Sequence, residues 1–243
     1  MTSQSSDNVL QDPAEPHGGW SLAARLNSLR AAVLGANDGI VSTAGVVVGV
    51  AGATGDKGAI LIAGIAALVA GAISMAAGEY VSVSTQRDTE KSMLRIERQE
   101  LHEDPEGELE ELTQLLEAKG ISRPLAEQVA EDLTAHDALG AHAEVELGID
   151  PKDLTNPWHA AWASMAAFTV GALLPLLTIT FSSAALRTWV TVASVALALA
   201  LTGWTGAYLG RSPRARAMAR TVTGGLLAMG VTYAIGALIG SRL

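Results

Sequence analysis

The sequence predicts an all-α membrane protein with five transmembrane helices and a three-helix acidic bundle inserted between helices 2 and 3. Two observations carry this prediction. Of the 243 residues, 49% are hydrophobic and only 17% are charged, and the mean hydropathy is +0.30, which is more apolar than a typical soluble domain. The charge is also uneven, because residues 87–153 carry 19 acidic and 7 basic side chains, a net charge of −12, whereas the rest of the chain has a net charge of +3.

Five apolar segments each come close to the roughly 20 residues that a helix needs to cross the hydrocarbon core of a bilayer. Backbone groups find no water partners in that core, so all five segments should be helical. The segments cover residues 31–55, interrupted only by Asp38, and then residues 58–78, 160–186, 188–210 and 221–241.

The chain before the first span divides into a tail and a short helix. Residues 1–19 are predicted to be a disordered tail, because they are rich in Pro, Gly and Ser and lack the basic start and apolar core of a signal peptide. From Trp20, leucines alternate with Arg25 and Arg30, which favours a short interfacial helix. Residues 20–86 therefore hold this helix and the first two spans, and residues 154–243 hold the other three.

The distribution of basic residues predicts the orientation. An odd number of spans puts the two termini on opposite sides, and cytoplasmic loops of membrane proteins are enriched in Lys and Arg. The N-terminus, the acidic insert at 87–153 and the link between the last two spans are therefore expected in the cytoplasm. The basic residues on that side are Arg25, Arg30, Arg87, Lys91, Arg211, Arg214, Arg216 and Arg220, against Lys57, Arg187 and Arg242 on the other.

A carboxylate lies inside the first span. Facing lipid, Asp38 would cost roughly 2.5 to 3.5 kcal/mol, so it is expected to face a cavity, a partner or an ion path. At 1.5 Å per residue, Asp38 lies about 12 Å beyond Arg30 and Glu79 about 12 Å before Arg87, so the two carboxylates have similar depth. Met75 lies one turn from Glu79 on the same helix face. Two carboxylates and a thioether favour Fe²⁺ and its neighbours over Mg²⁺ or Ca²⁺, and the carboxylates also bind protons.

Structural alternatives remain open for these three residues. Asp38 could cap a broken helix, Glu79 could lie in the headgroup zone, and Met75 could only pack. Small residues at four-residue or seven-residue spacing predict close helix contacts, within the chain or across a dimer, and Pro175 predicts a kink in the third span. The small residues are Gly35, Gly39, Gly45, Gly49, Gly64, Gly71, Gly78, Gly236 and Gly240.

The acidic insert predicts three helices. The second span should run on as a helix to Pro105, a second helix should extend from Pro105 to Gly120, and a third from about Ser122 to Gly148. Glutamates three apart share a helix face, and converging carboxylates make an oxygen-rich metal site, although such pairs are also typical of a solvated acidic surface. The candidates are Glu97, Glu100, Glu108 and Glu111, the i, i+4 pair His142 and Glu146, and further His102 and His136.

Several function classes are excluded or disfavoured. The chain has no cysteine, so thiolate metal sites and disulfides are excluded. No phosphate-binding loop, nucleophile elbow or zinc-protease motif is present, so no enzymatic activity and no prosthetic group are expected. The negative insert also argues against nucleic acid as a partner.

Two motifs in this order carry a family resemblance. "LRAAVLGANDGIVS", then "AISMAAGEYVSVSTQ" and the acidic insert resemble the vacuolar iron transporter family, from about Trp20 onward. The resemblance implies a five-span homodimer, with the ion path near its first two helices, which exports Fe²⁺ and often Mn²⁺ from the cytosol in exchange for protons. It assigns the path to Asp38 and Met75, and the metal ligands of the insert to Glu97, Glu100, Glu108, Glu111 and Glu146.

This chain departs from the family pattern at two points. It has His142 and Ala143 where family members with this insert can carry methionines, so a nitrogen replaces a sulfur near the metal. It also has Ala67 where some members carry a further carboxylate below the methionine.

The predicted function is therefore export of Fe²⁺ or Mn²⁺, with Zn²⁺ and Co²⁺ as further candidate ions, by proton antiport through a homodimer. A bacterial plasma membrane is the expected location, with a vacuolar or other organellar membrane as the alternative. A membrane-anchored metal buffer or sensor is the main alternative function. A membrane iron oxidase is disfavoured, because the insert lacks the Glu-x-x-His motif of di-iron bundles.

Overall fold

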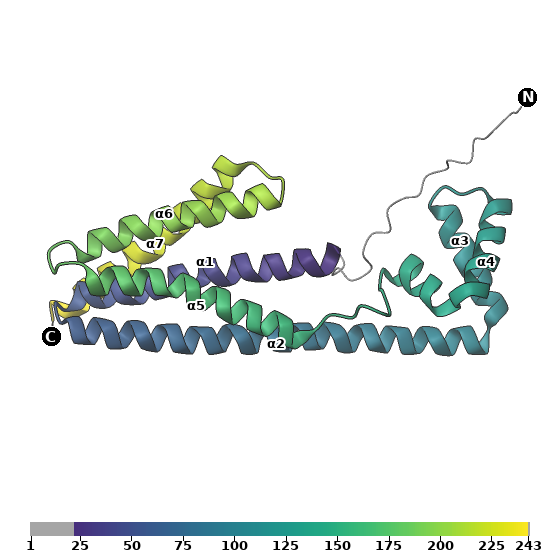
Figure 1. Ribbon diagram of the computed structural model, residues 1–243, viewed down its shortest axis with the longest axis horizontal. Helices are drawn as coiled ribbons and strands as arrows, with labels where there is room; N and C mark the ends of the chain where they lie inside the picture. The colour runs from purple at the N-terminus through teal and green to yellow at the C-terminus, as the bar shows by residue number, and fades with distance from the viewer. Residues whose placement is uncertain (1–21, 243) are drawn as a thin grey trace, which may run out of the picture.

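The computed structural model of the protein describes residues 22–242, with side chains from Arg30 onward. This part of the chain is entirely helical, as predicted, and contains no strand (Figure 1). Its elements are α1 (Leu22–Ala53), α2 (Lys57–Glu103), α3 (Pro105–Ala118), α4 (Arg123–His142), the π-helical turn η1 (Ala143–Leu147), α5 (Pro157–Phe181), α6 (Arg187–Leu209) and α7 (Arg214–Gly240).

Five of the described helices are long and apolar enough to cross a membrane, namely α1, α2, α5, α6 and α7. This number agrees with the five spans predicted from hydropathy. From Leu22 onward, the residues for which a separate interfacial helix was predicted continue into α1 without a break. Trp20 and the predicted tail at 1–19 lie outside the described residues.

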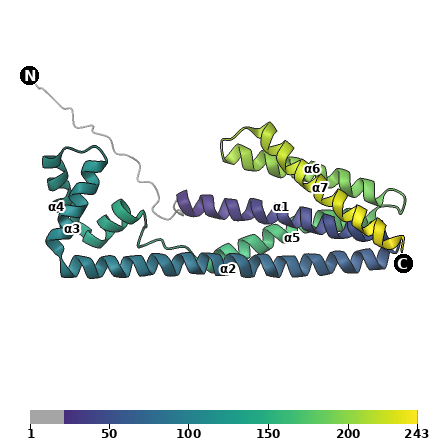
Figure 2. The ribbon, with the colours of Figure 1, turned by 180° about the vertical axis from the view of Figure 1, so that it is seen from behind.

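Helix α1 is the centre of the membrane part. It contacts α2, α5, α6 and α7, and Figures 1 and 2 show it between α2 on one side and the α6–α7 pair on the other. The core of this part is apolar and draws on all five helices. Its buried members are Ile40, Ala44, Val47, Val48, Ile60, Leu176, Ile179, Val195, Leu199 and Met229.

Glycines allow α1 to approach its neighbours within the same chain. A Cβ atom at Gly39 would clash with the carbonyl oxygen of Phe168 on α5, and a Cβ at Gly236 of α7 would clash with that of Gly49. Such backbone approach is the role of small residues in membrane helices. By contrast, Gly78 has no neighbour within 4 Å, so the glycines of α2 do not form one continuous packing seam.

Helix α5 continues through Pro175 to Phe181 and is not interrupted there. Proline cannot donate a backbone hydrogen bond. Thr178 lies almost one turn after Pro175. Its hydroxyl donates to the carbonyl oxygens of Leu174 at 3.0 Å and of Pro175 at 3.1 Å. The helix is therefore not broken at Pro175, and the kink predicted there stays a prediction.

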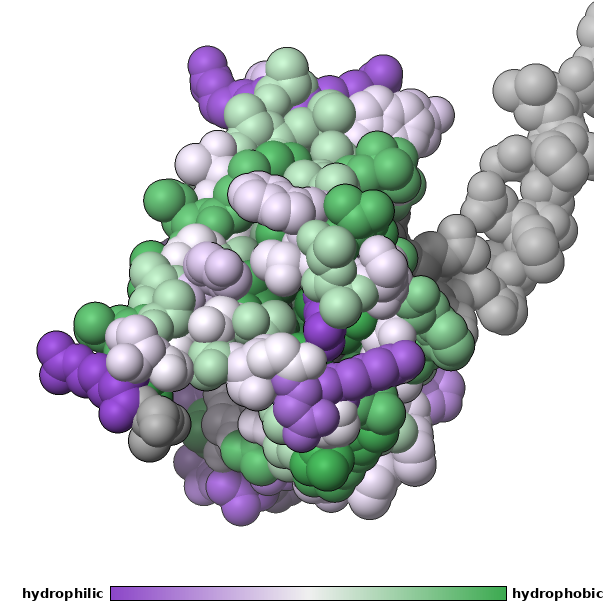
Figure 3. Space-filling view, turned by 90° about the vertical axis from the view of Figure 1, so that its left-hand side faces the viewer, coloured by the Kyte–Doolittle hydropathy of each residue, from purple (hydrophilic) through white to green (hydrophobic). Residues whose placement is uncertain are grey.

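The loops at one end of the membrane part are tied together. Nη2 of Arg187, at the start of α6, donates to the carbonyl oxygen of Gly55, in the α1–α2 loop, at 3.0 Å. Figure 3 views this end, where hydrophobic and neutral residues predominate and hydrophilic side chains lie in a few separate places.

Helix α2 is one continuous helix of 47 residues, as predicted. At 1.5 Å per residue it is about 70 Å long, roughly twice the thickness of the hydrocarbon core, so its second half extends beyond the membrane. Asp104 separates α2 from α3, because its N–H donates to Glu100 at the end of α2 and its carboxylate accepts from the N–H of Gly107 in α3 at 3.0 Å. Helices α3 and α4 lie at this far end (Figure 1).

The acidic bundle, which comprises the second half of α2 with α3, α4 and η1, has its own small apolar core. The prediction of one unbroken helix from Ser122 to Gly148 is wrong, because Asp137 has extended dihedral angles (φ −159°, ψ 84°). Its carboxylate accepts from the N–H of Gly140 at 3.0 Å, so it acts as the N-cap of a new helical segment. Gly148, with φ 66°, then ends η1.

Candidate metal sites

Four side chains from α2, α3, α4 and η1 meet in the acidic bundle. The His142 side chain is completely buried, and its Nδ1 lies 3.0 Å from Oε1 of Glu97. The same nitrogen lies 3.5 Å from Oε2 of Glu108 and 3.6 Å from Oε2 of Glu146. We call these four residues the His142 cluster. One ligand atom each from Glu97, Glu108 and His142 fall within 4.8 Å of one another. With Glu146, three of the five predicted carboxylates therefore converge on His142.

The local backbone positions His142 and Glu146. The kink at Asp137 redirects the end of α4, and the following turn is π-helical, with the N–H of Ile149 bonded to the carbonyl oxygen of Ala143 at 2.7 Å. A π-helical turn is wider than an α-helical turn and is frequent at functional sites. The predicted i, i+4 pair is therefore present, but part of it lies in a π-helical turn.

The His142 cluster carries unbalanced negative charge. Burial raises the pKa of Glu97 to about 7, and repulsion from Glu146, Glu108 and the more distant glutamates adds to the rise. Burial also raises the pKa of Glu108, which His142 partly opposes. Oε1 of Glu97 and both ring nitrogens of His142 are buried without a hydrogen-bond partner, so the short contact to Nδ1 is not an aligned hydrogen bond.

A divalent cation would supply the positive charge that the His142 cluster lacks. The buried oxygen and nitrogen atoms that have no hydrogen-bond partner would become its ligands. Carboxylates and an imidazole suit Fe²⁺, Mn²⁺ and Zn²⁺ and include no soft sulfur. The residues present therefore fit a transition-metal ion of borderline character.

The other predicted ligands of the bundle lie further out. Glu100 and Glu111 are exposed, but both act on the pKa of Glu97 and therefore lie nearby. Each Glu-x-x-Glu pair thus has one inner and one outer member. His102 and His136 are exposed and are not members of the His142 cluster, and His136 lines a separate surface cavity of about 520 Å³ near the kink.

A second group of glutamates in the bundle is already paired with an arginine. Arg123 binds Glu110 at 2.5 Å, Glu127 at 2.7 Å and Glu117 at 3.1 Å. Hydrogen bonds from Arg123 and Gln114 lower the pKa of Glu110 to about 2. Because Arg123 already pairs with all three glutamates, we exclude them from the candidate ligands.

The membrane part holds a second candidate site. An open cavity of about 970 Å³, which we call the α1 cavity, is lined by residues of α1, α2, α6 and α7. Asp38 and Met75 both line it, whereas Glu79 is half-buried and does not. Met75 also packs against the buried group around Phe168. Helix α1 runs unbroken through Asp38, so the alternative that Asp38 caps a broken helix is wrong.

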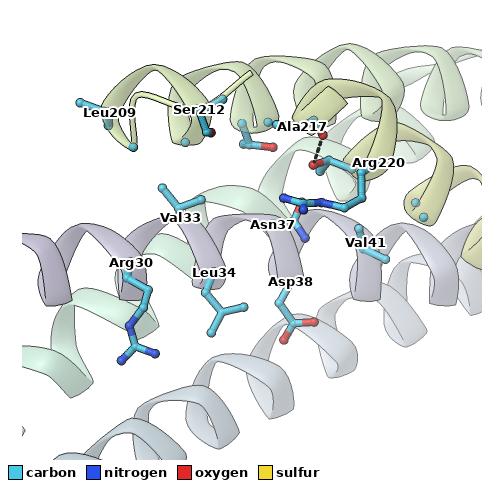
Figure 4. Close-up of a pocket in the computed structure, with 18 of the residues that line it drawn as sticks. Arg30, Val33, Leu34, Asn37, Asp38, Val41, Leu209, Ser212, Ala217 and Arg220 are labelled. Carbon is cyan, nitrogen blue, oxygen red and sulfur yellow. Dashed lines mark hydrogen bonds between the residues drawn. The ribbon is translucent and has the colours of Figure 1, made fainter. Parts of the chain in front are cut away.

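Two residues of the α1 cavity were not singled out as site residues from the sequence. Asn37 and Arg220 both line the cavity, and Oδ1 of Asn37 is buried without a partner. Figure 4 shows Arg220 of α7 close to Asn37, while Asp38 points to another side of α1. Asn37 adjoins the aspartate in sequence, but nothing in its spacing indicated burial. Arg220 was counted only as a loop charge.

Comparison with known proteins identifies the family of the chain. A sequence profile of the VIT family matches residues 29–237. A protein of Acanthamoeba castellanii, named vacuolar iron transporter, is 43% identical over 86% of this chain and 78% of its own length. Vacuolar iron transporter homolog 5 of Oryza sativa subsp. japonica is 40% identical over 96% of this chain and 92% of its own.

The likeness also extends over the whole chain. Vacuolar iron transporter homolog 4 of Arabidopsis thaliana is 34% identical over 100% of this chain and 99% of its own length. The matched residues 29–237 include α2 with its extension, the acidic bundle and all but the last few residues of α7. The chain therefore belongs to the VIT family, whose members are transporters and not enzymes.

Proposed function

We propose that this protein exports Fe²⁺ or Mn²⁺ from the cytosol as a homodimer, in exchange for protons. The observation that carries the proposal is that Asp38 and Met75 line one open cavity between the membrane helices. A carboxylate that lines an open cavity is not sealed in an apolar core, which supports a place on an ion path. The names of the relatives, as vacuolar iron transporters, support iron as the cargo.

The two sites would act in sequence. The His142 cluster offers three carboxylates and an imidazole, which would collect the dication. The carboxylate of Asp38 would then neutralise part of its charge inside the membrane, and the thioether of Met75 would favour Fe²⁺ or Mn²⁺ over harder ions. Glu79, Glu100 and Glu111 lie outside the compact sites and would contribute negative charge near the route.

Proton exchange is supported by the chemistry of the ligands. A carboxylate that binds a dication also binds protons, so the two compete for one group. Ala67 stands where a deeper carboxylate would be needed for a second proton site. We therefore assign the exchange in the membrane to Asp38, one proton-binding group per subunit.

The proposed orientation rests on the arginines. Arg30 begins the first span, Arg211 follows the fourth and Arg214 begins the fifth, so with five spans they lie on one side of the membrane. By the positive-inside rule we assign that side, with the acidic bundle, to the cytoplasm. The relatives are named as vacuolar, whereas the sequence favoured a bacterial plasma membrane. In both membranes the proposed transport removes metal from the cytosol.

Transport into proteoliposomes with an enclosed metal-sensitive dye tests the proposal. Asp38→Ala and Met75→Ala should each lower the initial rate of Fe²⁺ or Mn²⁺ flux by at least about tenfold, since even indirect metal-site residues often cost that much. Asp88→Asn is the matched control, because Asp88 is an exposed carboxylate of α2 beyond the apolar segment. Normal flux in both alanine variants would reject the route. Repeating the assay with and without a pH gradient separates antiport from a channel.

A metal buffer or sensor is the second candidate function. The observation that favours it is that the His142 cluster is complete in itself, with all its members in the acidic bundle. This alternative predicts that the protein binds metal but that the proteoliposomes show no flux above protein-free vesicles.

A further inference from the structure

A cluster of arginines and aromatic side chains lies where α6 ends and α7 begins. The α1 cavity reaches the same link at Leu209 and Ser212, but Arg211, Arg214 and the aromatic residues of the cluster do not line it. The rings of Trp204 and Tyr208 stack at 5.4 Å with 6° between their planes. The guanidinium of Arg214 lies over both rings, 5.0 Å from the centre of Tyr208 and 5.8 Å from that of Trp204. These distances are within the range of cation–π attraction.

A surface cavity adjoins this stack. It measures about 470 Å³ and is lined by Tyr208, Leu209, Arg211, Ser212 and Arg214, together with Ala207. The lining side chains therefore supply two guanidinium groups and two hydroxyls beside the apolar side chain of Leu209. A guanidinium that stacks on a ring keeps its N–H groups free at its edge, so Arg214 remains a hydrogen-bond donor to a ligand.

The positive charge of this cluster has no counter-ion among residues 30–242, whose side chains the structure describes. Among the described residues, the arginines of the α6–α7 link, Arg211, Arg214 and Arg216, form no ion pair. Residues 154–243 contain no Asp or Glu at all. The protein as a whole has a net charge of −9, so any attraction of anions to this place is local.

The backbone also holds an arginine in an unfavourable conformation here. Arg211 has φ 48°, a left-handed conformation that glycine adopts without cost at helix ends. Its side chain nevertheless lines the cavity. Strain of this kind, where it persists, points to function.

The depth of the cluster identifies the anion. Helix α6 spans the membrane from Arg187 to Leu209, so Tyr208 and Leu209 lie at a boundary between hydrocarbon and water. Trp and Tyr are enriched at this level, and basic residues there attract anionic headgroups. We infer that the stack of Trp204, Tyr208 and Arg214, with Arg211, binds the phosphate of an anionic phospholipid whose acyl chains pass Leu209.

This inference depends on α6 and α7 crossing the membrane and not on the ion that is transported. Its failure is therefore distinguishable from that of the proposed function. An acidic segment of a second copy is the competing partner, but the stacked aromatic pair at the membrane boundary favours a lipid. The two are separated in the experiment below.

The test measures lipid preference with full-length protein in phosphatidylcholine vesicles. Spin-labelled phosphatidylglycerol and spin-labelled phosphatidylcholine are compared by the fraction of each that the protein immobilises. The wild type should prefer phosphatidylglycerol, and the double variant Arg211→Gln/Arg214→Gln should lower this preference roughly fivefold or more. Arg242→Gln, at the other end of the membrane part, is the matched single-charge control and should change it little.

Two further arms define the ligand and the role of the stack. Arg214→Lys keeps the charge but loses planar stacking, and Trp204→Leu keeps the charge and removes a ring, so each should give an intermediate preference. Circular dichroism shows whether each variant is folded. The variants Arg214→Lys and Trp204→Leu keep the inference testable if the double variant does not fold.

Four results would overturn the inference. The first is an unchanged preference in the double variant, and the second is an equal loss in Arg242→Gln, which would be a general charge effect. The third is complete loss on addition of millimolar inorganic phosphate, which would assign the site to a free anion. The fourth is a change in oligomeric state with unchanged lipid preference, which would assign the arginines to an acidic partner chain.

Discussion

The two candidate metal sites differ in how closely their side chains are assembled. The His142 cluster places three carboxylates 3.0 to 3.6 Å from Nδ1 of the His142 imidazole, and this side chain is fully buried. The α1 cavity is open, measures about 970 Å³, and offers one carboxylate and one thioether. Two arginines, Arg30 and Arg220, also line it.

This difference indicates different tasks. A compact set of converging ligands holds a cation firmly, whereas a single carboxylate in a wide cavity near positive charge holds one briefly. Transport requires that an ion binds well enough to enter and weakly enough to leave. The difference therefore supports our proposal that the acidic bundle collects the ion and that the α1 cavity passes it, and each role has its own consequences.

The largest expected effect is the loss of metal binding when the centre of the cluster is removed. His142→Ala deletes the buried nitrogen that three carboxylates surround, so the affinity of the acidic bundle for Mn²⁺ should fall by about 100-fold or more. Isothermal titration calorimetry of the detergent-solubilised full chain measures it. Glu131→Gln is the control, because Glu131 is exposed on α4 outside the cluster. Unchanged affinity in His142→Ala would show that the metal binds elsewhere.

The next effect concerns pH. A metal ion needs ionised Glu97, whose pKa is raised to about 7, so protons compete below that value. Affinity for Mn²⁺ should be nearly constant above pH 8 and fall roughly tenfold between pH 7.5 and pH 6. Titrations at a series of pH values measure this slope. Glu97→Gln should bind more weakly and lose most of the pH dependence in this range, and an equally steep slope in that variant would contradict the assignment.

The same shift predicts how the stability of the metal-free bundle depends on pH. The pKa of Glu97 is about 7 in the folded state and 4.5 as an unperturbed group, so the folded state binds more protons between these values. Metal-free stability should therefore rise as pH falls from about 7 to about 4.5. The melting temperature should change by a few degrees. A divalent ion should reverse the trend by stabilising the ionised form, which thermal melts with and without a chelator measure.

The smallest expected effect concerns the kink. Asp137→Ala removes the carboxylate that accepts from Gly140, a capping bond worth about 1 kcal/mol. We expect a lower melting temperature and a modest loss of metal affinity, because His142 lies on the segment that Asp137 caps. Asp132→Ala, at an exposed position on the same helix, is the control. Equal effects of the two substitutions would argue against a positioning role for the kink.

Much of the fold could be predicted from the sequence because its signals are strong and additive. Hydropathy over about 20 residues gives the spans, and the block of acidic residues gives the insert. Pro105 and the capping Asp104 mark where α2 ends. The kink at Asp137 is a local capping interaction inside an otherwise helical pattern, and its only signal was an aspartate three residues before Gly140.

The candidate sites were predictable in composition but not in arrangement. Spacing of three put Glu97 with Glu100 on one helix face, yet only Glu97 is buried. Which member faces inward depends on how α2 and α3 rotate against His142, which is a tertiary property. Likewise, Arg220 enters the α1 cavity only through the packing of α7 against α1, and no spacing within either helix indicates this.

The most direct test of the account separates binding from flux in one protein. Asp38→Asn and His142→Ala are each reconstituted into proteoliposomes, and both Mn²⁺ binding and initial Mn²⁺ flux are measured. The account predicts that Asp38→Asn retains wild-type binding by the acidic bundle but loses flux. His142→Ala should lose that binding and keep flux at saturating Mn²⁺. Wild-type flux in Asp38→Asn would contradict the central claim that Asp38 lies on the route of the ion.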